Sequence, residues 1–150
     1  MKDSHGDRLA LFVRDMVYAK KQVRGSGVDL TAASIRRLAG KGSVDFGGGE
    51  WTAAEARELE PQKRAPEDEY GWWELEPGQY LLRYNEKLAF PPPCTALIVP
   101  AQRLLLAGGW HAAVATDGQE PVAVLCVGQG GLRMKQNARV STLVAANPQE

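Results

Sequence analysis

The stretch from Trp72 to Pro93, WWELEPGQYLLRYNEKLAFPPP, constrains the fold of this 150-residue chain more than any other. Its apolar side chains recur among polar ones with a rough period of two, at Leu75, Tyr80, Leu82, Tyr84 and Leu88. This period is typical of strands, whose alternate side chains face opposite sides of a sheet. Pro77-Gly78 is a turn signal and the three prolines at 91–93 end the run. The stretch therefore predicts a strand, a turn and a second strand.

The second half of the chain continues this pattern of short apolar runs between turn residues. We expect strands at 95–99, 110–115, 121–127, 132–134 and 140–144. Thr116-Asp117-Gly118 predicts a turn, and the glycine-rich segment 128–131 predicts the tip of a hairpin. Arg103 to Ala107 predicts a short helix, because helix formers are followed by Gly108-Gly109 as a C-cap.

The first half of the chain is predicted to be less regular. Residues 7–22 have apolar side chains at i, i+3, i+4, i+7 and i+8, which predicts an N-terminal helix. Residues 27–30 predict a short strand, and residues 35–38 fit either a helical turn or part of a strand. Thr52 and Glu55 form a possible capping box, which predicts a short helix over 53–59.

These patterns favour one domain over residues 1–150, with a glycine-rich and charged insertion at 39–70. Many short strands and few helices predict a mainly β fold, a sandwich or jelly roll with an N-terminal helix and one short helix.

The composition excludes several classes of partner. The formal net charge is zero, so bulk electrostatics predicts neither a nucleic acid nor a membrane as partner. The two cysteines, Cys94 and Cys126, have no metal-ligand spacing and make no disulfide framework. No apolar run approaches the ~20 residues that span a bilayer. We therefore expect a cytoplasmic protein without a metal site of its own.

The order of several segments resembles the dUTPase and dCTP deaminase superfamily. Leu75 to Leu82 resembles the family's Leu-x-Pro-Gly-Glu-Phe-x-Leu turn, and Asn85 to Pro91 resembles the Glu-x-Ile-x-Leu-Pro that follows. Residues 100–108 occupy the place of the Arg-Ser-Ser-Leu helix, and residues 116–125 occupy the place of the Asp-Pro-Gly-Tyr-Glu-Gly hairpin. Residues 132–144 resemble the closing segment with Arg-Ile-Ala-Gln-Leu-Val, and Gly27 to Leu30 resembles the early Ala-Ser-Val-Asp-Leu strand.

The resemblance implies a distorted jelly roll that assembles as a homotrimer, with sites where subunits meet. It implies a deoxynucleoside triphosphate as ligand, and Mg²⁺ brought by that nucleotide if the chain is an active dUTPase. In dUTPases a carboxylate activates water for attack on phosphorus, whereas in the deaminases a glutamate moves protons on the pyrimidine ring.

The chain departs from the family at each functional position. Ala101, Gln102 and Arg103 stand where the family has Arg-Ser-Ser, so Gln102 and Arg103 are the candidate phosphate contacts. Thr116 occupies the place of the catalytic aspartate, with Asp117 beside it as candidate general base.

Two further positions show the same loss. Cys126 replaces the deaminase glutamate, although Glu120 lies nearby. Thr142 replaces the phosphate-contacting glutamine. The nucleotide-binding candidates are therefore Gln102, Arg103, Thr116, Glu120 and Thr142, and Asp117 is the catalytic candidate.

Other chemically notable residues have structural alternatives. His111 fits a base or ligand in the pocket, although a histidine in a strand beside Trp110 is more often a structural or interface residue. Asp29 fits a carboxylate near the site or a cap at a strand end. Trp72 and Trp73 fit stacking on a base, or a pair divided between core and interface.

Two main hypotheses follow, and whether the chain is an enzyme stays open between them. In the first, the chain is a superfamily member of deoxynucleotide metabolism with a weakened or lost active site. In the second, it is an active dUTP diphosphatase that uses Asp117 and Arg103. A dCTP deaminase and an unrelated β-sandwich interaction domain are the remaining alternatives.

Overall fold

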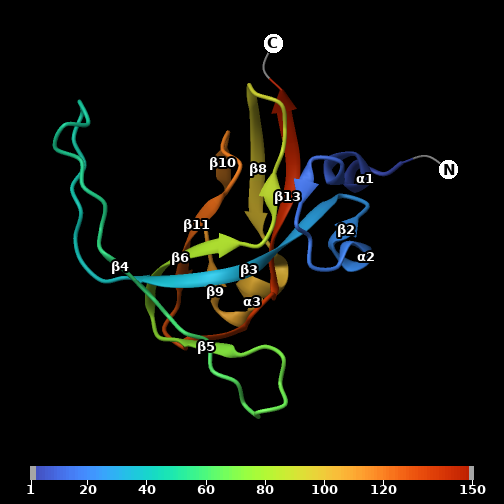
Figure 1. The fold of residues 1–150 in the computed structure, drawn as a ribbon. Coiled ribbons are helices and arrows are strands. Elements are labelled where there is room, and N and C mark those ends of the chain that lie inside the picture. Colours follow the sequence, from blue (N-terminus) through green and yellow to red (C-terminus); the bar gives the residue numbers. More distant parts are fainter. Residues whose placement is uncertain (1–2, 149–150) are drawn as a thin grey trace.

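The computed structural model describes residues 3–148 and shows a mainly β protein, as the sequence predicts. Figure 1 shows curled sheets at the centre and small helices near the N-terminus. In chain order the elements are α1 (His5–Ala10), β1 (Val13–Arg14), α2 (Ala19–Gln22), β2 (Val23–Arg24), β3 (Gly27–Leu38), β4 (Ala56–Glu58), β5 (Trp72–Leu75), β6 (Gly78–Tyr84), β7 (Lys87–Leu88), β8 (Cys94–Pro100), α3 (Gln102–Ala107), β9 (Gly109–Trp110), β10 (Val114–Thr116), β11 (Val122–Val127), β12 (Leu132–Lys135) and β13 (Arg139–Pro148).

The main sheet has the strand order β10-β8-β13-β3-β6-β11-β9 and its pairings are antiparallel. The long strand β3 joins its two halves: residues 28–31 pair with β13, and residues 32–37 pair with β6. A register shift between Ala32 and Ser34 marks the point where β3 changes partner. Antiparallel sheets that curl in this way enclose a core between their inner faces.

The buried residues follow the period of two that the sequence shows. Tyr80, Leu82 and Tyr84 of β6 face inward, while Gln79, Leu81 and Arg83 alternate with them. The core also contains fully buried aliphatic residues from β3, β8, β11 and β13, namely Val28, Leu30, Ile35, Ile98, Leu125 and Leu143. No helix within residues 3–148 is long and apolar enough to cross a bilayer.

Several sequence predictions are confirmed. The 95–99 and 121–127 runs form β8 and β11, and residues 27–30 together with 35–38 form β3. The predicted short helix is α3, and Gly108 ends it in the left-handed region at φ 113°. A residue without a Cβ adopts that conformation at no steric cost.

The predicted helix over 7–22 is wrong as a single element. Only His5–Ala10 and Ala19–Gln22 are helical, and β1 lies between them. Val13 pairs with Leu88 in β7, and Phe12 stacks on Phe90 with ring centroids 4.9 Å apart. These long-range contacts outweigh the helical spacing, because intrinsic helix propensity differs by only a few tenths of a kcal/mol per residue.

The predicted helix over 53–59 is also wrong. Ala56–Glu58 forms β4, which pairs with residues 36–38 of β3. The exposed edge of β3 offers unpaired backbone groups there, and a passing segment satisfies them as a strand.

The predicted strand at 110–115 and the predicted hairpin at 128–131 need correction as well. The predicted strand 110–115 is two strands, since β9 pairs with β11 and β10 pairs with β8. The turn at Gly128–Gly131 exists, with the Gly131 N–H donating to the Gly128 carbonyl at 3.0 Å. It does not close a hairpin, because β12 pairs with β5 rather than with β11.

A buried carboxylate occupies the corner where β3 changes partner. Glu86 is 0% exposed and accepts hydrogen bonds from the Thr31 N–H at 2.7 Å, Thr31 Oγ1 at 2.6 Å and Gln22 Nε2 at 2.9 Å. It thereby satisfies a backbone donor that the sheet ladder leaves free at this position. Burial raises the pKa of Glu86 above its ordinary value, against the opposing effect of these hydrogen bonds.

We predict a pH-dependent stability contribution from Glu86. Because the folded-state pKa is raised, the contribution is complete below the unfolded-state pKa and is lost as the pH rises through the folded value. Relative to Glu86→Gln, the wild-type free energy of unfolding should therefore fall as the pH rises above 4.5, the ordinary pKa of a glutamate.

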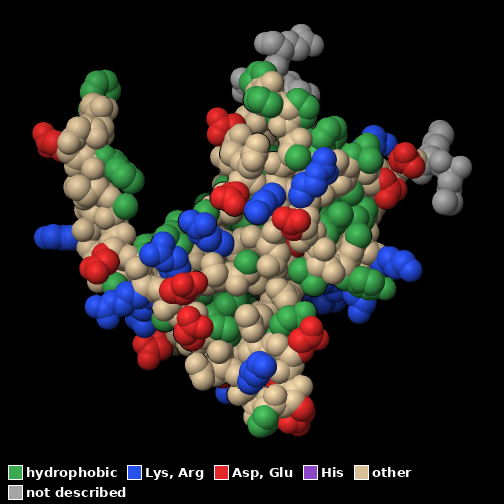
Figure 2. Space-filling view, in the orientation of Figure 1, with side chains coloured by type: hydrophobic (Ala, Val, Ile, Leu, Met, Phe, Trp, Pro, Cys, Tyr) green, Lys and Arg blue, Asp and Glu red, His purple; other side chains and the backbone are tan. Residues whose placement is uncertain are grey.

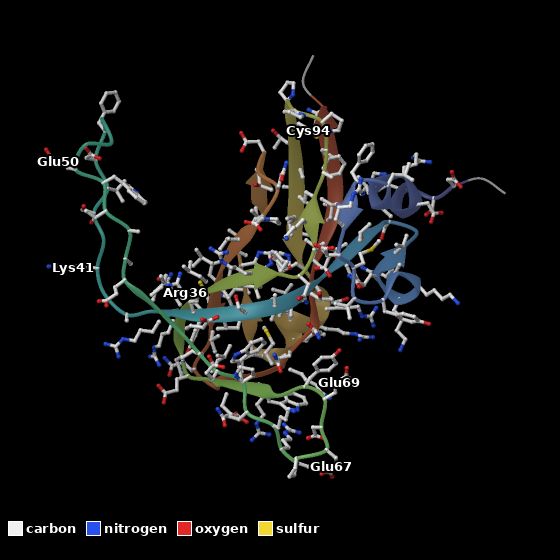
Figure 3. All side chains as sticks on the ribbon, in the orientation of Figure 1. Arg36, Lys41, Glu50, Glu67, Glu69 and Cys94 are labelled. Atoms are coloured by element: carbon white, nitrogen blue, oxygen red, sulfur yellow. The ribbon has the colours of Figure 1, made fainter. Side chains whose placement is uncertain are left out.

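Urea unfolding at several pH values measures this difference. The matched control is Glu67→Gln, since Glu67 lies on the exposed 60–70 loop (Figure 3), and its difference from wild type should stay constant. A constant difference for the Glu86 variant as well would contradict the prediction.

Candidate functional site

The candidate site is a cavity of about 470 Å³ at the junction of β2, β3, β13 and the start of α3. Three guanidinium groups and one carboxylate belong to its lining, from Arg24, Arg103, Arg139 and Asp29. The remaining lining residues are uncharged, namely Ser26, Val99, Pro100, Ala101, Gln102, Thr142 and Val144. The cavity therefore has an excess of positive charge, although the chain as a whole is neutral.

Asp29 organises this charge. Its carboxylate, on a residue only 6% exposed, accepts from Arg24 Nε at 3.0 Å and from Thr142 Oγ1 at 3.0 Å through one oxygen. Its second oxygen accepts from Arg139 Nη1 at 3.3 Å. Hydrogen bonds between charged groups hold side chains in fixed geometry, so the two guanidinium groups are positioned before any ligand arrives.

The strand register explains why these residues meet. Thr142 of β13 pairs directly with Asp29 of β3, which places their side chains on one face. Arg24 belongs to the short strand β2, which is held beside β3 by the pairing of Val23 with Val28. Thr142 also pairs with Val99 of β8, and the chain continues from β8 into α3 with Gln102 and Arg103.

The structure brings together four residues that the sequence singled out: Asp29, Gln102, Arg103 and Thr142. It adds Arg24 and Arg139, which sequence reasoning missed. For Arg139 the signal was present, because it stands at the arginine of the segment that resembles Arg-Ile-Ala-Gln-Leu-Val, three residues before Thr142. For Arg24 the sequence carries no such signal.

Thr116, Asp117 and Glu120 lie elsewhere. Thr116 ends β10 and pairs with Ala96, whereas Thr142 pairs with Val99 on the other side of β8. Three residues along a strand and two strand spacings correspond to roughly 14 Å. Asp117 is exposed in the turn after β10, and the Glu120 carboxylate is 3.9 Å from Lys87 Nζ. One copy of the chain thus keeps the candidate base away from the charged cavity.

His111 is in the core rather than in the cavity. The Ala112 carbonyl can only accept, so His111 Nδ1 donates to it at 2.8 Å. In the neutral ring Nε2 then accepts from Ser141 Oγ at 2.8 Å, and Tyr84 Oη donates to that hydroxyl at 2.7 Å. Burial lowers the pKa of His111 and raises the pKa of Tyr84 to about 12, so both are neutral near pH 7.

The remaining candidates also have structural partners. Cys126 is half-buried in β11, and Gln79 Nε2 donates to its sulfur at 3.8 Å. Trp73 is buried and its indole N–H donates to the Leu59 carbonyl at 2.9 Å. The Arg64 guanidinium lies 3.9 Å from the ring centroid of Trp72, so this ring fastens the 60–70 loop to β5 by a cation–π contact.

The described residues do not fit a protein-built metal site. Within residues 3–148 no group of three or more His, Cys, Asp and Glu side chains is arranged to hold a metal ion. The Asp29 carboxylate in the cavity already receives two guanidinium groups and a hydroxyl. Divalent ions of the magnesium type require several oxygen ligands, and the cavity residues themselves do not provide that set.

Comparison with known proteins decides the family. A probable deoxyuridine 5'-triphosphate nucleotidohydrolase of Aeropyrum pernix is 30% identical over 128 residues, covering 83% of this chain and 75% of that protein. The chain belongs to the dUTPase and dCTP deaminase superfamily. No family model matches it.

Further comparisons agree with this membership. A protein of the same name in Methanosarcina mazei is 26% identical over 136 residues, covering 88% of this chain and 76% of that protein. A 2'-deoxycytidine 5'-triphosphate deaminase of Agrobacterium tumefaciens shares the fold with a TM-score of 0.56 at 15% identity. The superposition covers 89% of this chain but only 42% of the deaminase chain. The sequence-based resemblance to this superfamily is therefore confirmed.

We predict that the Asp29 carboxylate holds the cavity together. Asp29→Asn should lower the free energy of unfolding by about 1–3 kcal/mol, because two guanidinium groups then lie near each other without a counter-charge. Urea unfolding at neutral pH measures the change. The control is Glu76→Gln, whose exposed ion pair with Arg37 should contribute about 0.5 kcal/mol or less. Equal effects of the two substitutions would contradict a structural role for Asp29.

Proposed function

We propose that this chain binds a deoxynucleoside triphosphate through the cavity around Asp29, and that its catalytic apparatus is weakened or lost. It would act in deoxynucleotide metabolism in the cytoplasm, as a single domain over residues 1–150 with an insertion at 39–70. The observation that carries the proposal is the cluster of Arg24, Arg103 and Arg139 in one cavity. Guanidinium groups are the side chains best suited to phosphate oxygens, because their planar donors match two oxygens at once.

The positions of the acidic groups support the loss of catalysis. A general base must come within hydrogen-bond reach of the water it activates. Asp29 lies in the cavity, but both of its carboxylate oxygens already accept hydrogen bonds from guanidinium groups. Asp117 lies outside the cavity of its own chain and is exposed. Cys126 stands at the place of the deaminase glutamate.

We propose a homotrimer as the assembled state. Asp117, Thr116 and Glu120 lie at the β10–β11 turn, and in a ring of identical subunits that turn can approach the cavity of a neighbour. Such a ring combines the residues that the single chain keeps apart. Thr116 and Glu120 would then contact the nucleotide together with Gln102, Arg103 and Thr142.

The alternative function is an active dUTP diphosphatase with a divergent site. The observation in its favour is the exposed carboxylate of Asp117, which a neighbouring cavity could receive. In that case dUTP would give dUMP and pyrophosphate, with Mg²⁺ arriving on the triphosphate. Asp117 would be the base and Arg103 the phosphate contact. A deaminase reaction is less favoured, because a thiol is a poor proton relay near neutral pH.

We predict that deoxynucleoside triphosphates raise the melting temperature through the cavity. At a concentration about 100-fold above Kd a ligand stabilises the folded state by about 2.7 kcal/mol, which corresponds to roughly 5–10 °C. Arg103→Ala and Arg139→Ala should lose most of this rise, because each removes a guanidinium group from the cavity. Thermal-shift measurements with dUTP, dCTP and dTTP test this.

The control variant is Arg37→Ala, since Arg37 forms its ion pair with Glu76 outside the cavity. It should keep the full ligand-induced rise. No rise with any of the nucleotides, or an equal rise in the cavity variants, would refute nucleotide binding at this site.

We predict that pyrophosphate release from dUTP with Mg²⁺ is no faster for the wild type than for Asp117→Asn. The expected result follows from the replacement of the family's functional residues, since Ala101, Thr116 and Thr142 stand at the places of its arginine, aspartate and glutamine. Robust wild-type turnover would overturn the proposed loss of catalysis. If Asp117→Asn then abolished it, the diphosphatase alternative would hold. If turnover persisted in Asp117→Asn, that residue would be discarded as the base. Ammonia release from dCTP would instead indicate a deaminase.

A further inference from the structure

Residues 39–55 form an arm that stands away from the rest of the molecule. Figure 1 shows the arm leaving the body beyond the pairing of β3 with β4. At its base the Ala39 N–H donates to the Glu55 carbonyl at 2.7 Å. Further out, Ser43 and Thr52 exchange two backbone hydrogen bonds of 3.0 Å each. The arm is thus a two-stranded ribbon, a structure that is only marginally stable without a surface to pack on.

The tip of the arm has an ordered internal geometry. The Asp45 carboxylate accepts from the Glu50 N–H at 2.9 Å and from the Gly48 N–H at 3.1 Å. Ser43 Oγ donates to the Glu50 carbonyl. Gly48 has φ 88°, which lets the chain turn back at little steric cost. The tip therefore presents its other side chains from a defined loop.

Those side chains are large, apolar and exposed. Val44 is 88% exposed, Trp51 is 59% exposed, and Phe46 is as exposed as in an extended chain. Figure 2 shows apolar atoms at the tip and along the side of the arm, clear of the main body. Together they offer roughly 400 Å² of apolar surface, which is about half of what each partner buries in an ordinary protein interface.

The charges of the arm do not suit a phosphate-rich partner. Lys41 is its single cation among residues 39–55, against Asp45, Glu50 and Glu55. Figure 3 shows Lys41 and Glu50 pointing outward from the arm, while Asp45 is engaged within the tip. A nucleic acid or an anionic membrane requires clustered cations. The surface that receives the arm is therefore expected to be apolar.

The same chain carries an apolar surface of that kind, on the outer face of β9 and β11. Val122 and Val124 alternate along β11 and are exposed, and Trp110 of β9 is 52% exposed. Trp110 pairs with Cys126, and Val124, two residues before Cys126 on β11, pairs with Leu81, so these four side chains share one face of the sheet. Val122 lies two residues before Val124 on β11 and is on the same face. We call Trp110, Val122 and Val124 the outer apolar face.

We propose that the arm of one copy packs its tip against the outer apolar face of a second copy. The inference rests on the self-assembly proposed above and assigns a contact within it. Within one chain the arm projects clear of the body (Figure 1), so its tip cannot cover that chain's own face. A contact between two different surface patches of identical chains is heterologous, and it closes when the copies form a ring.

The first experiment is sedimentation equilibrium of the full chain over a range of concentrations. The wild type should reach a multiple of the one-chain mass. The double variant Phe46→Ser with Trp51→Ser should need at least tenfold more protein to assemble, and Trp110→Ser should behave in the same way. The control Leu11→Ser also removes an exposed apolar side chain, directly after α1 and across the molecule from the arm (Figure 1), and should assemble like the wild type. Far-UV circular dichroism verifies folding.

The outcomes separate the two proposals. A wild type that stays monomeric at all concentrations would overturn both the trimer and the arm contact. Arm variants that assemble like Leu11→Ser would overturn the arm contact alone. Nucleotide binding is followed independently by the melting temperature, so its failure is distinguishable from either result.

The second experiment locates the contact and does not require Trp110→Ser to fold. Phe46→benzoylphenylalanine is prepared in ¹⁴N and ¹⁵N forms, which are mixed in equal amounts and irradiated. Cross-linked peptides of mixed isotope that join the arm to β9 or β11 are expected. Cross-links within one isotope only, or to other segments, would refute the proposed contact.

Discussion

The fold depends on the corner in β3 at Thr31, where the strand leaves β13 and begins to pair with β6. At this corner the ladder cannot satisfy the Thr31 N–H, and the buried carboxylate of Glu86 accepts it at 2.7 Å. An unpaired backbone donor in the core would destabilise the fold by about 1–3 kcal/mol. One acidic side chain, supplied by the loop after β6, thus lets a single strand run through both halves of the sheet.

The corner and the charged cavity are parts of one network. Gln22 Nε2 donates both to the Glu86 carboxylate and to the Asp29 carbonyl, each at 2.9 Å. Asp29 lies two residues before Thr31 on the same strand, so the two side chains point to the same face of β3. Its carboxylate then orders Arg24 and Arg139. The cations of the cavity are consequently fixed by the same interactions that shape the sheet, which favours a site that needs little rearrangement to receive an anion.

Local patterns predicted much of the fold, and the failures have a common cause. The alternation at Tyr80, Leu82 and Tyr84 and the cap at Gly108 were sufficient to predict β6 and the end of α3. The helical spacing in residues 7–22 failed because Val13 pairs with Leu88, far away in the sequence. The capping box at Thr52 failed because β3 offered an edge to residues 56–58. In both cases a long-range strand pairing outweighed a weak local preference.

The sequence by itself determined the mainly β class and the superfamily, and it marked Gln102, Arg103 and Thr142 as candidate nucleotide contacts. It could do so because strand period, turn residues and motif order are local properties. Only the tertiary structure decided that Arg24 and Arg139 meet Asp29, that Asp117 lies apart from them, and that the arm leaves the body with its apolar tip exposed. Strand pairing and register decide such facts: the pairing of β3 with β13 brings Arg139 to Asp29, 110 positions away in the sequence. No local pattern carries that information.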